Sequence, residues 1–140
     1  MKTMLTDEIK RFIERIPLAI VASADSGGHP HLALGSYIKA LDGEHLLFEN
    51  WFCQTTLRNV AQNPWVAVAV MARDMATGYQ FIGNVAHGSD TAILNGYAPE
   101  VEPPGEPQTR TRLVVRVEKV LAFCGGLHTD VALGGSRNGP

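Results

Sequence analysis

The sequence contains little of what marks a secreted, membrane-spanning or nucleic-acid-binding protein. Only two of its 140 residues are cysteines, and Cys53 and Cys124 show none of the spacings typical of metal or redox motifs. No apolar run approaches the length that crosses a bilayer. The formal net charge is −2 and there is no basic stripe, so we expect neither nucleic acid nor a membrane as a partner.

The beginning of the chain also lacks the uninterrupted apolar segment of a signal peptide. Four charged residues interrupt it: Lys2, Asp7, Glu8 and Lys10. We therefore expect a cytoplasmic protein. The length suits one domain over residues 1–140, with a glycine-rich tail from about residue 125.

What the sequence does contain is a regular order of elements between residues 31 and 70. Side chains of two different kinds alternate over residues 32–39, which predicts a pleated strand with two distinct faces. Asp42-Gly43 predicts a tight turn, because both residues tolerate positive φ, and residues 46–48 predict the return strand.

A predicted helix start follows this hairpin. Thr55 or Thr56 can cap a short helix over residues 57–61, and Pro64 follows its end. The first N–H groups of a helix have no internal partner and lie at the positive end of its dipole, so an anion can bind there. Lys39, near the end of the preceding strand, could add a positive charge. On these residues alone, a surface helix capped by threonine is the simpler interpretation.

The remaining elements follow from helical or alternating patterns. An amphipathic helix is predicted from Thr6, its cap, to Ile16. Residues 89–96 fit either a short helix or a linking strand, and the proline-rich residues 99–107 predict an exposed extended loop. The other predicted strands cover residues 18–24, 65–72, 77–87 and 112–123.

Four collinear blocks carry a resemblance to a known family: IPLAIVASADSGGHPHLA, SYIKALDGEHLLFEN, TTLRNVAQNPWVAVAV and TGYQFIGNVAH. Between Ile16 and about His87 the chain resembles the FMN-binding split barrel of the pyridoxamine 5′-phosphate oxidase-like family. The similarity is greatest to its small FMN-binding and flavoredoxin-like members. It implies a mainly β fold, a six-stranded antiparallel split β-barrel with an N-terminal helix and a short helix after the third strand.

The resemblance also implies a site for non-covalently bound FMN. The second strand would run along the flavin and end in a lysine near the cofactor, and a loop over residues 49–53 would lie beside the ribityl chain and the ring. The phosphate oxidases have Ser-Arg-Lys where this chain has Gln54-Thr55-Thr56, which brings fewer cations to the phosphate. The implied cofactor contacts are Gly35, Ser36, Tyr37, Lys39, Glu49, Asn50, Trp51, Gln54, Thr55, Thr56 and Gly78.

The function that the resemblance implies is electron transfer through FMN, as an oxidoreductase or as an electron carrier. No pattern in the sequence indicates an acid–base pair, a nucleophile or a metal cluster, so no catalytic residue and no metal ligand is predicted. A non-enzymatic binding or regulatory module on the same barrel, or a deazaflavin (F420)-dependent reductase, are the alternatives. Family members are usually homodimers with flavin at the interface, where Trp51 and Phe52 would lie. The electron donor and acceptor are not identified.

Overall fold

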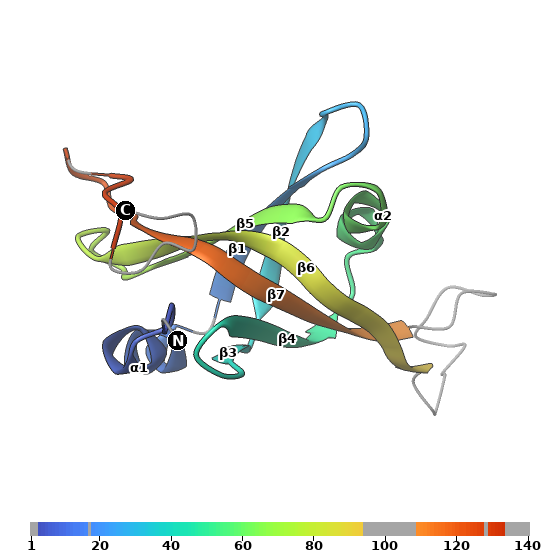
Figure 1. The fold of residues 1–140 in the computed structure, drawn as a ribbon, viewed down its shortest axis with the longest axis horizontal. Coiled ribbons are helices and arrows are strands. Elements are labelled where there is room, and N and C mark those ends of the chain that lie inside the picture. Colours follow the sequence, from blue (N-terminus) through green and yellow to red (C-terminus); the bar gives the residue numbers. More distant parts are fainter. Residues whose placement is uncertain (1–2, 17, 94–108, 128, 134–140) are drawn as a thin grey trace.

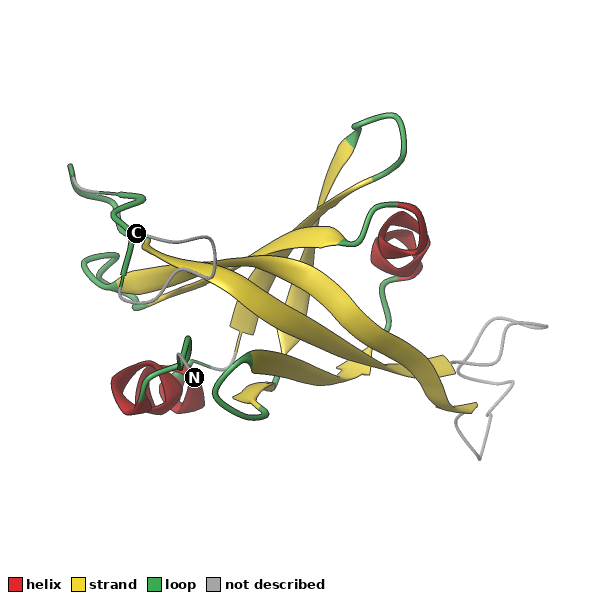
Figure 2. Ribbon diagram, in the orientation of Figure 1, coloured by secondary structure: helices red, strands yellow, loops and turns green. Residues whose placement is uncertain are grey.

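The computed structural model describes residues 3–16, 18–93, 109–127 and 129–133. In these residues the chain forms one curled antiparallel sheet and two helices, which lie far apart near opposite ends of the long β6–β7 pair (Figures 1 and 2). The elements in chain order are α1 (Asp7–Arg15), β1 (Leu18–Ala24), β2 (Pro30–Ser36), β3 (Ile38–Ala40), β4 (His45–Trp51), α2 (Gln54–Gln62), β5 (Trp65–Met71), β6 (Gly78–Ile93) and β7 (Thr109–Ala122).

The sheet has seven strands in the order β2-β1-β5-β6-β7-β4-β3, and every pair is antiparallel. Its two edge strands, β2 and β3, are consecutive in the chain, so the sheet curls into a half-barrel that brings its edges together. The contact across the open side is tight at Gly35 on β2. A Cβ there would lie 2.5 Å from Trp51 Cζ3 and 2.7 Å from Phe48 Cε1 on β4.

The prediction of six strands was wrong by one, because the strand predicted over residues 32–39 divides in two. Tyr37 has a φ of 57°, in the left-handed region, which turns the chain between β2 and β3. Ser36 therefore pairs with Leu18 on β1, whereas Ile38 pairs with Phe48 on β4. One predicted strand thus supplies both edges of the sheet.

The core lies inside the curl of the sheet, and α1 covers one side of it. Thr6 caps α1 by accepting a hydrogen bond from Ile9 N at 3.3 Å, as predicted, and Ile9 and Ile13 are buried. Phe12 packs edge to face against Tyr79 of β6 with 5.0 Å between ring centroids. The largest fully buried side chains are Trp51, Phe48, Phe81, Leu5, Ile13, Leu46 and Leu113.

Two predicted boundaries near the candidate site were wrong. The predicted loop over residues 49–53 is strand up to Trp51, because β4 continues to pair with β7 past a bulge. The second helix begins at Gln54 with Cys53 at its N-cap, so Thr55 and Thr56 lie in the first turn and do not cap it.

Elsewhere the pairing with β7 settles one open alternative. β6 continues as a strand to Ile93, so the first residues of the ambiguous segment 89–96 are strand and not helix. The predicted loop over residues 99–107 and most of the predicted tail lie outside the described residues. Each of the two described helices has nine residues, and neither is long and apolar enough to cross a membrane.

Candidate functional site

Polar contacts with the sheet hold α2 in place. Asn59 is buried and donates from Nδ2 to Ser23 Oγ on β1 at 3.0 Å. At the C-terminal end of the helix, Gln62 Oε1 accepts from the backbone N of Ser26 at 3.2 Å. The helix stops at Gln62 because Pro64 follows it, and its first turn begins directly after β4. The start of α2 is thereby fixed beside the end of β4.

The start of α2 lacks the acidic and capping side chains that are common at the N-terminus of a helix. Its first turn contains no acidic side chain, and Cys53 makes no side-chain capping hydrogen bond. Arg58 folds back along the helix and donates from Nη2 to Thr55 Oγ1 at 3.3 Å. A guanidinium therefore lies at the positive end of the helix dipole, an arrangement that favours an anion. The sequence analysis missed Arg58, although its spacing of three residues from Thr55 on a helix would have placed it there.

The two threonines differ in their surroundings. Thr55 is partly exposed, whereas Thr56 is fully buried and its Oγ1 has no hydrogen-bond partner among the described residues. Asn50 Oδ1, at the end of β4, is likewise buried without a partner in the part of the chain that the structure describes. Buried polar atoms are paired in the great majority of cases, because an unpaired one costs about 1–3 kcal/mol. Two predicted cofactor contacts are thus polar groups that a ligand or a water could satisfy.

Lys39 lies on β3 in an ionic cluster and not at α2. Its Nζ is 3.1 Å from Glu49 Oε2 on β4, and Arg112 Nη2 on β7 is 3.4 Å from Glu49 Oε1. The hydrogen bond and charge of Lys39, followed by those of Arg112, hold the pKa of Glu49 below its usual value. All three side chains are well exposed, so the cluster is screened by solvent. The structure therefore pairs two of the predicted cofactor contacts, Lys39 and Glu49, with each other.

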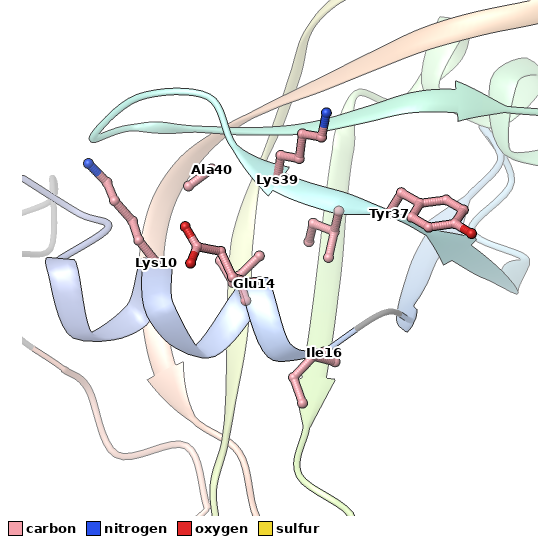
Figure 3. Close-up of a pocket in the computed structure, with 8 residues that line it drawn as sticks. Lys10, Glu14, Ile16, Tyr37, Lys39 and Ala40 are labelled. Atoms are coloured by element: carbon pink, nitrogen blue, oxygen red, sulfur yellow. The ribbon is translucent and has the colours of Figure 1, made fainter.

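A pocket of about 530 Å³ lies between α1 and β3 (Figure 3). Tyr37, 69% exposed, lines it, and Lys39 is at its edge with the ammonium group pointing away from α1 (Figure 3). The lining residues are Lys10, Ile13, Glu14, Ile16, Tyr37, Ile38, Lys39 and Ala40. The pocket does not include Thr55 or Thr56. Two groups of predicted contacts therefore lie apart from each other, one at the start of α2 and one at the β3 edge.

Three other predicted contacts have structural roles of their own. Gly35 is required by the rings that pack on it, and a Cβ at Gly78 would collide with the carbonyl oxygens of Phe123 and Val70. Trp51 is 1% exposed and packs edge to face on Phe48. Among the remaining ones, Ser36 is partly buried and Gln54 is exposed. The positions of these residues do not show whether they contact a cofactor, so their cofactor contacts stay predictions.

Comparison with known proteins identifies the family. The sequence matches the family described as pyridoxamine 5′-phosphate oxidase over residues 5–124. The chain belongs to this family of FMN-binding split barrels. None of the functionally curated proteins is similar enough to the chain to count as a match.

Solved structures share the split-barrel fold at low identity. HupZ of Group A Streptococcus is 22% identical, with a TM-score of 0.66, over 90% of this chain and 99% of that chain. An FMN-binding protein from Syntrophomonas wolfei is 13% identical, with a TM-score of 0.64, over 88% of this chain and 87% of that one. An F420 reductase is 24% identical, with a TM-score of 0.61, over 79% of this chain and 94% of that chain. These similarities establish the fold alone.

The residues present fit an anionic cofactor of the kind that the family binds. The start of α2 offers the amides of its first turn, a guanidinium and no acidic side chain, and two buried polar atoms, Asn50 Oδ1 and Thr56 Oγ1, have no partner among the described residues. The described residues contain no group of three or more His, Cys, Asp or Glu side chains that could hold a metal ion.

Proposed function

We propose that this split barrel binds FMN non-covalently and works as an oxidoreductase or an electron carrier. The observation that carries the proposal is the guanidinium of Arg58 at the start of α2, in a member of a family whose relatives include an FMN-binding protein. When bound, FMN supplies the redox chemistry, and the protein supplies position and hydrogen bonds.

In this proposal the phosphate lies at the first turn of α2, held by the amides of that turn, Thr55 and Arg58. Arg58 supplies a cation that the missing Ser-Arg-Lys sequence would otherwise provide. Lys39 and Thr56 stay predicted phosphate contacts, but both need a local change. Lys39 must leave Glu49, and the buried Thr56 must become accessible. Asn50 Oδ1 is a candidate acceptor for a polar group of the cofactor.

A deazaflavin is the second candidate cofactor, because an F420 reductase is among the structural neighbours. A regulatory module without a cofactor is the third, favoured by the pairing of Lys39 with Glu49. The experiment that separates them is a titration of the purified protein with FMN and with F420, followed by absorbance and by quenching of cofactor fluorescence. Saturable binding of FMN supports the proposal. Binding of F420 alone supports the second candidate, and binding of neither supports the third.

We also propose that the protein is a homodimer that buries the outer face of β1 and β2. Antiparallel pairing aligns Ile20 with Leu34 and Ala22 with Leu32 on this face. Leu32 is 68% exposed and Leu34 70%, and Leu18 and Ile20 beside them are also exposed. A contiguous apolar patch of this kind is typical of an interaction surface, and a second copy of the chain presents the same patch.

Replacing both Leu32 and Leu34 with glutamate is expected to convert a dimer into a monomer, because charges would have to be buried at the interface. Sedimentation velocity at several concentrations measures the change. Leu41→Glu is the matched control, since Leu41 is an exposed leucine outside this face and its replacement leaves the dimer intact. A wild-type chain that sediments as a monomer at every concentration would contradict the proposal.

A further inference from the structure

A second cavity, of about 460 Å³, lies between α1 and the turn that joins β5 to β6. Its volume is within the range of about 300–1,000 Å³ that is typical of pockets for small ligands. Two backbone hydrogen bonds fix the turn, from Ala72 N to Thr77 O at 2.8 Å and from Met75 N to Ala72 O at 2.9 Å. The cavity lies beside α1, far from α2 (Figure 1), and the described residues that line it include none of the predicted cofactor contacts.

Two arginines of α1 line this cavity. Arg11 and Arg15 are one helical turn apart, and both are exposed. Neither forms an ion pair with Glu8 or with any other carboxylate in the part of the chain that the structure describes. The helix dipole accounts for Arg15, which lies in the last turn, but it does not account for Arg11. Like charges at this spacing destabilise a helix slightly, and an oxyanion in the cavity would relieve their repulsion.

The opposite wall of the cavity supplies a hydroxyl donor. Tyr79 is 8% exposed and packs edge to face on Phe12, and its hydroxyl makes no hydrogen bond to another described residue. Burial, and then the charge of Glu8, raise the pKa of Tyr79, so the hydroxyl keeps its proton and stays a donor. Polar groups on a side chain that is largely removed from water usually have a partner, and an acceptor in the cavity would provide one.

The charges and the walls together favour a carboxylate as the ligand group. Guanidinium groups bind the oxygens of carboxylates and phosphates through paired hydrogen bonds. Because Glu8 lies on the same wall as the two arginines, the cavity suits a singly charged anion better than a phosphate monoester, whose charge is about −1.5 to −2 at pH 7. The rings of Phe12 and Tyr79 and the methyl group of Ala72 offer apolar surface to the rest of the ligand.

We propose that this cavity binds the carboxylate of a small organic acid that has an apolar body. The guanidinium groups of Arg11 and Arg15 hold the carboxylate oxygens, and the hydroxyl of Tyr79 donates to one of them. The apolar body lies against Phe12. Binding is non-covalent, and because the cavity is remote from α2, the inference does not depend on the proposed FMN site.

The test is a titration of the ¹⁵N-labelled full chain with benzoate, followed in NMR spectra that include the Nε–H signals of arginine side chains. Saturable shifts of the Arg11 and Arg15 signals are expected. Benzyl alcohol, which has the ring without the charge, is expected to cause none at the same concentrations. Arg11→Gln is expected to weaken benzoate by about tenfold, because a hydrogen bond to a charged group is lost. Lys10→Gln is the matched control, because it removes the same charge from another face of α1 and leaves the affinity unchanged.

Tyr79→Phe separates a role in binding from a role in the fold. It removes only the hydroxyl and is expected to weaken benzoate by about fivefold. It is expected to unfold at the same urea concentration as the wild type, because this hydroxyl has no partner among the described residues. An unchanged benzoate affinity in Arg11→Gln overturns the inference, and so does an equal loss in Lys10→Gln. Inorganic phosphate that binds more tightly than benzoate overturns the assignment to a carboxylate.

A titration with FMN in the presence of saturating benzoate distinguishes this cavity from the proposed function. FMN is expected to bind with unchanged affinity and to leave the benzoate-induced shifts in place. Displacement of benzoate by FMN overturns the separate site. A chain that binds benzoate as expected but binds no FMN supports the cavity site and refutes only the proposed function.

Discussion

Replacing Trp51 with alanine is expected to lower the free energy of unfolding by about 3–5 kcal/mol, the usual cost of truncating a buried aromatic ring. Trp51 is 1% exposed, packs edge to face on Phe48 with 5.1 Å between centroids, and fills the gap that Gly35 leaves open. Its Nε1 also donates to Cys53 O, and the variant loses this bond. Domains of this size are stable by only about 5–15 kcal/mol, so the loss is a large fraction of the total.

The next residue provides the control. Phe52 is 50% exposed, and Phe52→Ala is expected to cost less than about 1 kcal/mol. Urea unfolding followed by far-ultraviolet circular dichroism, at one fixed protein concentration, measures both variants. Equal losses for the two variants would mean that Trp51 does not form part of the core.

The position of Trp51 explains what the sequence analysis could not predict. Phe48 and Trp51 are three residues apart, and strict strand alternation would put them on opposite faces. The register between β4 and β7 shifts between these two residues, and this bulge returns Trp51 to the inner face. A bulge depends on the partner strand, which lies some 60 positions later in the chain, so local sequence does not reveal it.

The local signals that were correct depend on neighbouring residues alone. Thr6 caps α1 because its side chain reaches an amide three residues away, and Pro64 ends α2 by backbone geometry. The signals that failed depend on tertiary contacts. Tyr37 adopts a left-handed conformation where the chain passes from one edge of the sheet to the other. The pairing of Lys39 with Glu49 requires the β3–β4 register.

The features of the candidate site also divide into those that local sequence predicts and those that depend on tertiary contacts. Helical spacing alone would have placed Arg58 beside Thr55, so this cation was predictable from the sequence. The burial of Thr56 was not, because it depends on how α2 rests on β1 through Asn59 and Ser23. The position of the proposed anion site at α2 therefore follows from sequence, but which of its threonines is accessible to a ligand follows only from the packing of the helix.

Arg58→Ala is expected to weaken FMN binding by about one to two powers of ten and to leave riboflavin binding nearly unchanged. The reason is that a hydrogen bond to a charged group contributes roughly 1.5–3 kcal/mol, and riboflavin has the same ring and ribityl chain without the phosphate. Lys39→Ala is expected to give a similar loss if Lys39 leaves Glu49 on binding, and a negligible one if it does not. Raised salt is expected to shrink the effect by screening.

The measurement is a pair of fluorescence-quenching titrations, FMN and riboflavin, on the wild type and each variant. Arg15→Ala is the matched control, because Arg15 is an exposed arginine at the end of α1, away from α2 (Figure 1). Its replacement changes the net charge by the same amount, so it reports any loss due to overall charge alone. If riboflavin binding falls as far as FMN binding in Arg58→Ala, or if Arg15→Ala weakens FMN equally, then Arg58 does not hold the phosphate and the cofactor does not lie at the start of α2.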